Sequence, residues 1–129
     1  MLRTGILNPQ LNALLSRVRH TNLLVIADRG FPYWPMIETV DISLVDDIPT
    51  VVQVLAAIRS NFVIGCAWMA SEFAQNNGAG VRAQFAAALA GIRVEHLPHT
   101  EFKKRVPSAI GLVRTGDTTQ YANMILESA

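Results

Sequence analysis

Two histidines and one aspartate stand beside apolar runs and could exchange protons with a bound molecule. His20 precedes the apolar run 23–27, and Asp28 follows that run directly. His99 opens a second polar cluster near the end of the chain. Histidine titrates near neutral pH, and a nearby carboxylate can orient the ring or accept a proton. The pattern predicts acid/base chemistry, with His20 and Asp28 flanking one buried strand as a catalytic or orienting pair.

Polar side chains at the end of the chain offer hydrogen bonds to a ligand rich in hydroxyl groups. Tyr121 and Asn123 supply the donors and acceptors that hydroxyl recognition requires. Strand ends and the loops that follow them carry the binding sites of α/β sheets. We therefore expect these two residues to share a pocket with Asp28 and His99.

The same residues also have structural interpretations. His20 follows the first predicted helix, and a cation interacts favourably with a helix C-terminus. Asp28 precedes Gly30 and Pro32, and an aspartate in such a turn often accepts hydrogen bonds from backbone amides. Position alone leaves both interpretations open.

A metal site is the weaker interpretation of the histidines. His96 and His99 lie three residues apart, but only Cys66 and scattered carboxylates could complete a ligand set. The glycine-containing segment 78–80 lacks the lysine of a phosphate-binding P-loop. The sequence therefore predicts a site without a metal ion or a cofactor.

Length, composition and charge limit the classes to which the chain can belong. Its 129 residues are 50% hydrophobic and 16% charged, which predicts one folded domain over 1–129. The net charge of +1 predicts no nucleic-acid or membrane partner. The run 62–70 is shorter than the roughly 20 residues of a membrane helix, and segment 1–5 lacks the apolar stretch of a signal peptide. The single cysteine, Cys66, is typical of a cytoplasmic protein.

Helical and strand patterns alternate along the chain, which predicts an α/β domain with a largely parallel sheet. Strands are expected at 23–27, 37–44, 62–69, 93–97, 109–114 and 122–126. Helices are expected at 9–18, 49–58, 81–90 and 100–105, with a loop at 76–80. Asn8 and Pro9 are typical of a helix start, and Gly91 of a helix end.

Surplus apolar residues predict an assembly of several copies. The mean hydropathy of +0.27 is high for a small protein. Phe31, Tyr33 and Trp34 also lie on a loop that has little core of its own to enter. Large apolar surfaces that a monomer would expose are commonly covered by a partner. We therefore expect a homo-oligomer larger than a dimer.

Five motifs occur in one order and spacing that is more specific than any of them alone. They are His20-Thr21, Asp28-x-Gly30-x-Pro32, the segment 49–55, the segment 99–104, and the segment 114–126 with its Tyr121-Ala122-Asn123. Together they resemble the D-ribose pyranase and L-fucose mutarotase family over nearly the whole chain. The segment 51–55 and the Tyr-Ala-Asn motif place the chain nearer the ribose branch.

The resemblance implies a fold, an assembly and a set of site residues. The family has a single three-layer α/β/α domain and forms ring-like homo-oligomers, such as pentamers or decamers, with sites near subunit boundaries. His20 matches the proton donor of the family, and Lys103 matches a further pocket residue. The matched sugar-contacting positions are Asp28, His99, Tyr121, Ala122 and Asn123.

The implied activity is the interconversion of cyclic forms of a monosaccharide, as pyranose and furanose or as anomers. The reaction needs acid/base groups and no cofactor. Two alternatives remain: a non-catalytic monosaccharide-binding or sugar-transport accessory protein on the same scaffold, and an oligomeric scaffold with structural histidines.

One loop departs from the resemblance and bears on the choice of sugar. Arg29, Tyr33 and Trp34 follow Asp28 at positions where ribose-type relatives carry smaller or aliphatic residues. An arginine can bind a carboxylate or several hydroxyl groups. The loop therefore predicts a preference for a sugar other than ribose, such as a hexose or an acidic sugar. Alternatively, Arg29 pairs with an acid such as Asp41 or Glu38 at a subunit boundary.

Overall fold

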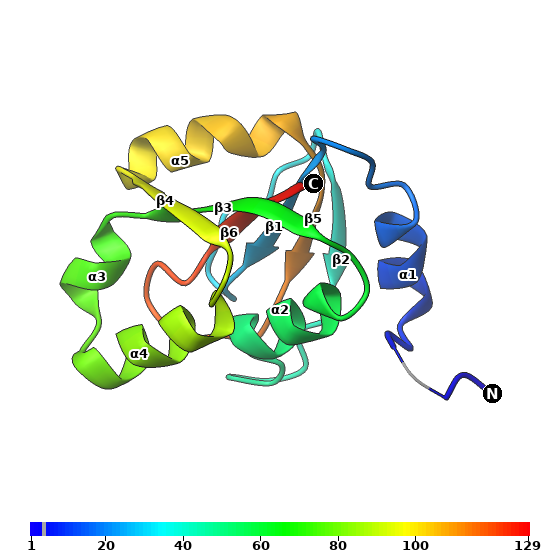
Figure 1. Ribbon diagram of the computed structural model, residues 1–129, viewed down its shortest axis with the longest axis horizontal. Helices are drawn as coiled ribbons and strands as arrows, with labels where there is room; N and C mark the ends of the chain where they lie inside the picture. The colour runs from blue at the N-terminus through cyan, green and yellow to red at the C-terminus, as the bar shows by residue number, and fades with distance from the viewer. Residues whose placement is uncertain (4) are drawn as a thin grey trace.

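Six strands form the central sheet in the computed structural model, which describes residues 1–3 and 5–129 (Figure 1). Thr4, in the N-terminal segment considered above, lies outside the described residues. The strand order is β2-β5-β1-β6-β3-β4. The strands are β1 (Leu23–Ala27), β2 (Glu38–Asp41), β3 (Ile64–Ala70), β4 (Arg93–Leu97), β5 (Ala109–Arg114) and β6 (Met124–Ser128). Only β6 runs antiparallel to its neighbours, so the sheet is largely parallel as predicted.

Helices cover both faces of this sheet and complete three layers. They are α1 (Pro9–Leu15), α2 (Val51–Arg59), α3 (Glu72–Asn76), α4 (Ala79–Ala88), α5 (His99–Arg105) and the 3-10 helix η1 (Val106–Ser108). Successive residues of a strand point to opposite faces. Leu24 and Ile26 of β1 accordingly join the core under α1, α2, α3 and α4, whereas Val25 and Ala27 join the core under α5. In Figure 1, α5 lies above the sheet and α2 and α4 lie below it.

Local capping explains where the first two helices begin. The Asn8 side chain accepts a hydrogen bond from the Leu11 N–H, and Pro9 occupies the first turn, as the sequence predicts. Thr50 and Gln53 form a capping box at the start of α2, so this helix begins at Val51, two residues after the predicted start. Such caps satisfy backbone N–H groups that have no partner inside the helix.

Several other predicted boundaries differ from the structure for local reasons. The strand predicted at 37–44 ends at Asp41, whose carboxylate accepts hydrogen bonds from the N–H and hydroxyl of Ser43. The strand predicted at 122–126 begins only at Met124, because Tyr121 has a left-handed backbone (φ 55°). The loop predicted at 76–80 is mostly helical, since α3 ends at Asn76 and α4 begins at Ala79.

Gly116 is required by the close approach of the loop between β2 and α2. A β-carbon there would lie 2.3 Å from the Val45 carbonyl oxygen and 2.8 Å from that of Ile48. Neither backbone atom can rotate away, so Gly116→Ala is expected to lower the free energy of unfolding by about 1–3 kcal/mol. Chemical denaturation measures this loss. Gly80→Ala is the control, because a β-carbon there meets nothing within 4 Å. Equal stability of the two variants would contradict the prediction.

The described residues contain no helix that is both long and apolar enough to cross a membrane. The thiol of Cys66 is buried in β3 and free.

Candidate functional site

An open cleft of about 380 Å³ lies where β1 and β5 end and β6 begins. Parallel strands bring their carboxyl ends to one edge of a sheet, and the antiparallel β6 starts at the same edge. The cleft is lined by segment 28–32, by His99 at the start of α5, and by segment 117–121 with Asn123. Asp28, His99, Tyr121 and Asn123, predicted to share a pocket, therefore line one cleft.

Asp28 and Asn123 hold each other in a reciprocal pair across the β1–β6 boundary. The Asp28 backbone N–H donates to Asn123 Oδ1 at 2.7 Å, and Asn123 Nδ2 donates to Asp28 Oδ2 at 3.0 Å. The other carboxylate oxygen, Oδ1, accepts the Gly30 N–H at 2.9 Å. Asn123 is only 3% exposed, so its amide has little freedom. The Asp28 carboxylate is thus fixed in direction before any ligand binds.

Burial raises the pKa of the Asp28 carboxyl above its ordinary value. Hydrogen bonds from Asn123 and the backbone N–H groups of Gly30 and Phe31 oppose this rise, and the negative charge of Asp117 adds to it. A carboxyl with a raised pKa can take up a proton at a higher pH than an exposed aspartate does.

The His99 imidazole lies among three aromatic rings. The Phe102 ring stacks on it at 6.0 Å between centroids with 13° between the planes. Tyr121 and Phe31 meet it edge to face at 5.1 Å and 6.3 Å. His99 Nδ1 is buried, and no described residue hydrogen-bonds it. Aromatic packing therefore holds the plane of the ring.

Burial lowers the pKa of the His99 imidazole. The positive charge of Lys103 on the same helix lowers it further, while the carboxylates of Glu72 and Asp28 act in the opposite direction. Since the pKa of Asp28 is raised, the pKa values of the two groups move towards each other. Two groups with converging pKa values in one cleft can pass a proton through a bound hydroxyl group.

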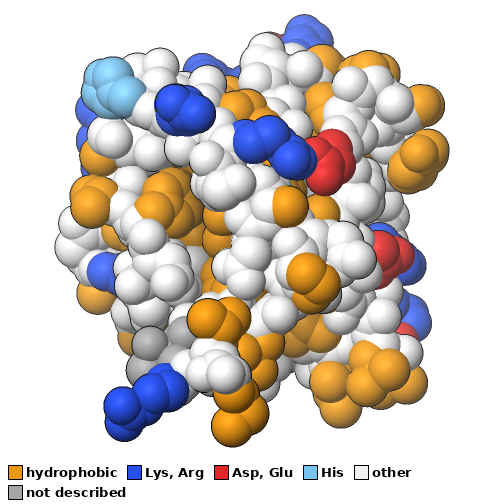
Figure 2. Space-filling view, turned by 90° about the vertical axis from the view of Figure 1, so that its right-hand side faces the viewer, with side chains coloured by type: hydrophobic (Ala, Val, Ile, Leu, Met, Phe, Trp, Pro, Cys, Tyr) orange, Lys and Arg blue, Asp and Glu red, His pale blue; other side chains and the backbone are white. Residues whose placement is uncertain are grey.

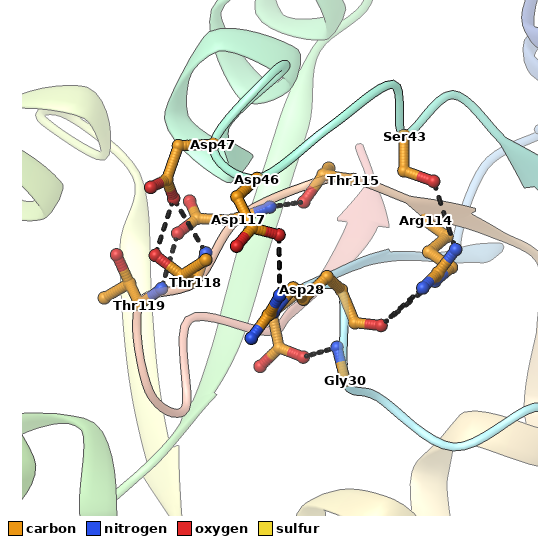
Figure 3. A network of polar contacts seen from close by, with 11 residues as sticks. Asp28, Gly30, Ser43, Asp46, Asp47, Arg114, Thr115, Asp117, Thr118 and Thr119 are labelled. Carbon is orange, nitrogen blue, oxygen red and sulfur yellow. Dashed lines mark hydrogen bonds and ion pairs between the residues drawn. The ribbon is translucent and has the colours of Figure 1, made fainter.

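Asp117 is a second carboxylate in the cleft, which the sequence offered only as one position of the motif segment 114–126. It is 2% exposed. Its carboxylate oxygens accept the N–H of Val51 at the start of α2 (2.8 Å). They also accept the N–H of Thr119 (2.8 Å), as Figure 3 shows. Its backbone oxygen accepts the Arg29 N–H. Asp117 thus joins α2 to both loops of the cleft. The available signal was an aspartate in a Thr-Gly-Asp-Thr turn directly after a buried strand.

The loop predicted to set specificity has its arginine already paired. Arg29 Nη1 donates to Asp46 Oδ1 at 2.6 Å, and its backbone oxygen accepts two hydrogen bonds from Arg114 (Figure 3). The acids expected as partners are engaged elsewhere: Asp41 pairs with Arg114, and Glu38 pairs with Arg17. Arg29 thus pairs with an acid of its own chain and still lines the cleft.

The two aromatic neighbours of Arg29 differ in exposure. Tyr33 is 76% exposed, and Trp34 is half-buried against the core under α5. Phe31 is buried in that same core, in edge contact with Phe102 at 6.2 Å. Contrary to the expectation from sequence, this loop therefore does have a core to enter, and of its three aromatic side chains Tyr33 alone is exposed.

Besides Tyr33 and Trp34 of the specificity loop, three predicted site residues lie outside the lining of the cleft. His20 is exposed at the opposite end of β1 from Asp28. Lys103 lies one helical turn after His99, in a shallow apolar hollow with Trp34. Ala122 is fully buried in the core between Tyr121 and Asn123. Among the described residues, no three His, Cys, Asp or Glu side chains are placed to hold one metal ion.

Sequence comparison relates the whole chain to one family. The sequence model of the RbsD / FucU transport protein family matches residues 1–129. The chain is 37% identical over 128 residues to D-ribose pyranase of Geobacillus kaustophilus, covering 99% of this chain and 93% of that protein. It is 38% identical over 128 residues to D-ribose pyranase of Chromobacterium violaceum, covering 99% and 97%.

Structure comparison agrees with the sequences. Bacillus subtilis RbsD, in complex with D-ribose, matches with a TM-score of 0.92 at 30% identity, covering 100% of this chain and 98% of that one. The fucose mutarotase of Streptococcus pneumoniae, in complex with L-fucose, matches in fold with a TM-score of 0.84 at 18% identity, covering 99% and 98%. The resemblance noted from the motifs and the three-layer fold it implies are both confirmed. The chain belongs to the RbsD/FucU family.

Proposed function

We propose that this protein interconverts the cyclic forms of a monosaccharide, as a pyranase or mutarotase that needs no cofactor. The observation that carries the proposal is the placement of Asp28 and His99 in one cleft, with pKa values that move towards each other. The D-ribose pyranases among its relatives, and the relative in complex with D-ribose, support a sugar substrate.

The reaction requires two proton transfers at neighbouring oxygens of the sugar. Opening the hemiacetal needs a proton on the ring oxygen and removal of the proton from the anomeric hydroxyl. In the proposed arrangement, the Asp28 carboxylate accepts the hydroxyl proton. His20 of a neighbouring copy donates the other proton to the ring oxygen, His99 contacts the sugar, and both proton transfers are reversed when the ring closes. Tyr121 and Asn123 orient the remaining hydroxyl groups.

His20 enters this scheme from a second copy of the chain. In its own subunit it lies at the far end of β1 from the cleft. We propose that assembly brings His20 of a neighbouring copy to the cleft as proton donor, with Lys103 and the backbone of Ala122 at the periphery of the sugar. The free, buried Cys66 supports a reducing compartment, the cytoplasm, as the place where the protein acts.

Saturation-transfer NMR on a panel of pentoses and hexoses tests the proposed function. We expect catalytic amounts of protein to increase magnetisation transfer between the ring forms or anomers of at least one sugar. A sugar that binds, as shown by chemical-shift changes of the protein, without faster exchange would support the non-catalytic binding protein instead. A protein that responds to none of the sugars would favour the structural scaffold.

The assembly is expected to be a homo-oligomer larger than a dimer. Hydrophobic side chains are exposed on the face that carries α1 (Figure 2). Tyr33, Leu44 and Val63 are each more than 70% exposed. Exposed apolar side chains in this number commonly mark contacts between subunits. Light scattering at micromolar concentration measures the mass, and a monomer would contradict the prediction. Leu44→Ser is expected to lower the mass, whereas Ala83→Ser on the exposed side of α4 serves as the control.

Arg29 is expected to set the preference between sugars. Arg29 lines the cleft, and its guanidinium keeps donors beyond the one used by Asp46. We expect the wild type to exchange a hexose or an acidic sugar faster than ribose. Arg29→Ala is expected to reduce this preference by about 10-fold, because a lost hydrogen bond to one substrate changes discrimination between two. A sugar panel on both proteins measures it. Arg17→Ala, which breaks a similar exposed ion pair outside the cleft, is the control. If ribose is the best substrate of both the wild type and Arg29→Ala, Arg29 does not set the preference between sugars.

A further inference from the structure

Glu72 contacts His99 from an element that does not line the cleft. The His99 backbone N–H donates to both carboxylate oxygens of Glu72, at 2.9 and 3.1 Å. Glu72 is the first residue of α3, and His99 is the first residue of α5, so the contact joins the starts of two helices. These residues are 27 positions apart, and neither the motifs nor the proposed function assigns a role to Glu72.

The contact replaces a cap that the start of α5 cannot supply. Pro98 occupies the N-cap position and makes no side-chain hydrogen bond to the helix. The N–H groups of a first turn have no partner within their helix, and a carboxylate is a favourable acceptor for them. This hydrogen bond lowers the pKa of Glu72, so the residue stays ionised. The backbone of His99 is thereby tied to α3.

The His99 side chain makes no hydrogen bond to any described residue. Its Nδ1 is buried without a hydrogen-bond partner among the described residues. In many acid/base sites, a hydrogen bond to one ring nitrogen sets the orientation of the other. Here packing against Phe102 and Tyr121 sets the ring plane, and the backbone position set by Glu72 determines where the ring enters that packing.

Three charged side chains surround the His99 ring, and Glu72 contributes one of them. Asp28 after β1 and Glu72 on α3 favour the protonated imidazole, whereas Lys103 on α5 disfavours it. Burial also disfavours the charged form, and an unpartnered Nδ1–H would add to this cost. The carboxylates of Glu72 and Asp28 therefore oppose the lowering of the His99 pKa by burial and by Lys103.

We propose that Glu72 is a positioning residue, which places the His99 imidazole in the cleft through its hydrogen bonds to the His99 backbone. The proposal rests on the proposed function in giving His99 a part in the sugar chemistry. Glu72 does not line the cleft and acts on the substrate only through His99. Asn77, just beyond α3, donates to the Gln120 backbone oxygen at 2.9 Å, so α3 supports a second wall of the same cleft.

Two substitutions separate the charge of Glu72 from its hydrogen bond. Glu72→Gln keeps an oxygen that can accept the His99 N–H but removes the charge, whereas Glu72→Ala removes both. We expect both variants to lower the pKa of His99, measured by NMR titration of its ring protons without sugar. We expect kcat/KM for sugar exchange to fall in both, most in Glu72→Ala and there by up to about 100-fold, as misplaced catalytic groups commonly cause. If Glu72→Ala does not fold, Glu72→Gln carries the test alone.

Glu101→Gln is the matched control for this experiment. Glu101 lies in the first turn of α5, is paired with Lys104 at 2.7 Å, and makes no hydrogen bond to His99. Unchanged His99 titration and unchanged exchange rates in the Glu72 variants, relative to Glu101→Gln, would overturn the proposal and leave Glu72 as a helix cap. If the wild type accelerates the exchange of no sugar, the proposed function fails, and the titration without sugar still decides whether Glu72 controls His99.

Discussion

Replacing His20 with alanine is expected to slow sugar exchange by about 10²- to 10⁴-fold, the usual contribution of a general acid or base. The fold is expected to remain intact, because His20 is exposed in the turn before β1. His20 lies far from the cleft of its own subunit. The five residues of β1, which lie between His20 and Asp28, alone extend over about 17 Å, and this is too far for both residues to act on one sugar within one subunit.

Mixed oligomers test how His20 acts. His20→Ala lacks the donor, and Asp28→Asn lacks the acceptor, so each is expected to be inactive alone. If a site combines His20 of one copy with Asp28 of its neighbour, unfolding and refolding the two variants together restores part of the exchange rate. His96→Ala, which changes another exposed histidine that lies outside the cleft, should remain fully active. A folded His20→Ala protein with the wild-type rate would exclude the role. A mixture that stays inactive would exclude the shared site.

Some elements of the fold could be predicted because local signals agree with their tertiary surroundings. The strands at 23–27, 93–97 and 109–114 were predicted with the bounds the structure shows. The first and last are apolar runs that are buried on both faces of the sheet, bounded by turn residues.

The alternation of strands and helices does not predict the antiparallel direction of β6. Alternation predicts parallel strands, each joined to the next through a helix. Segment 115–123 contains no helix and returns the chain at the same edge of the sheet, which makes β6 antiparallel to β1. Parallel strands need a long crossover connection, so the shortness of this segment was the available signal.

Some residues of the candidate site could likewise be predicted from the sequence, and others could not. Asp28, His99, Tyr121 and Asn123 were identifiable from their types, their places after apolar runs and the family motifs, and the structure brings them to one cleft. The contact of Glu72 with His99 joins residues far apart in sequence through a backbone N–H. Such a contact leaves no local pattern, because any acidic residue in a helix start looks the same from sequence.

The second large effect is expected for Asp28→Asn, which should reduce sugar exchange by at least about 10²-fold, since an amide cannot accept the hydroxyl proton. In the wild type, the exchange rate should fall as the pH is lowered through the raised pKa of Asp28, so the acid limb lies above the ordinary range of an aspartate. Asn123→Ala removes a hydrogen bond to the ionised carboxylate and should move this limb to higher pH. An acid limb that stays in place in Asn123→Ala would show that Asp28 does not control it.

Stability measurements provide a readout of Asp28 that does not depend on the substrate. A carboxyl whose pKa is raised by folding favours the folded state at low pH, and this contribution is lost as the pH rises through the folded pKa. The asparagine side chain of the variant is neutral at every pH, so the variant has no such pH-dependent contribution to stability. The unfolding free energy of Asp28→Asn minus that of the wild type should therefore increase from pH 3 to pH 7. Chemical denaturation at both pH values measures this difference. A change in hydrogen bonding that does not depend on pH contributes equally at pH 3 and pH 7, so it cancels when the two values are compared. A difference that decreases over this range would mean that the pKa of Asp28 is lowered by folding, and the carboxylate would then be a structural group rather than the base of the reaction.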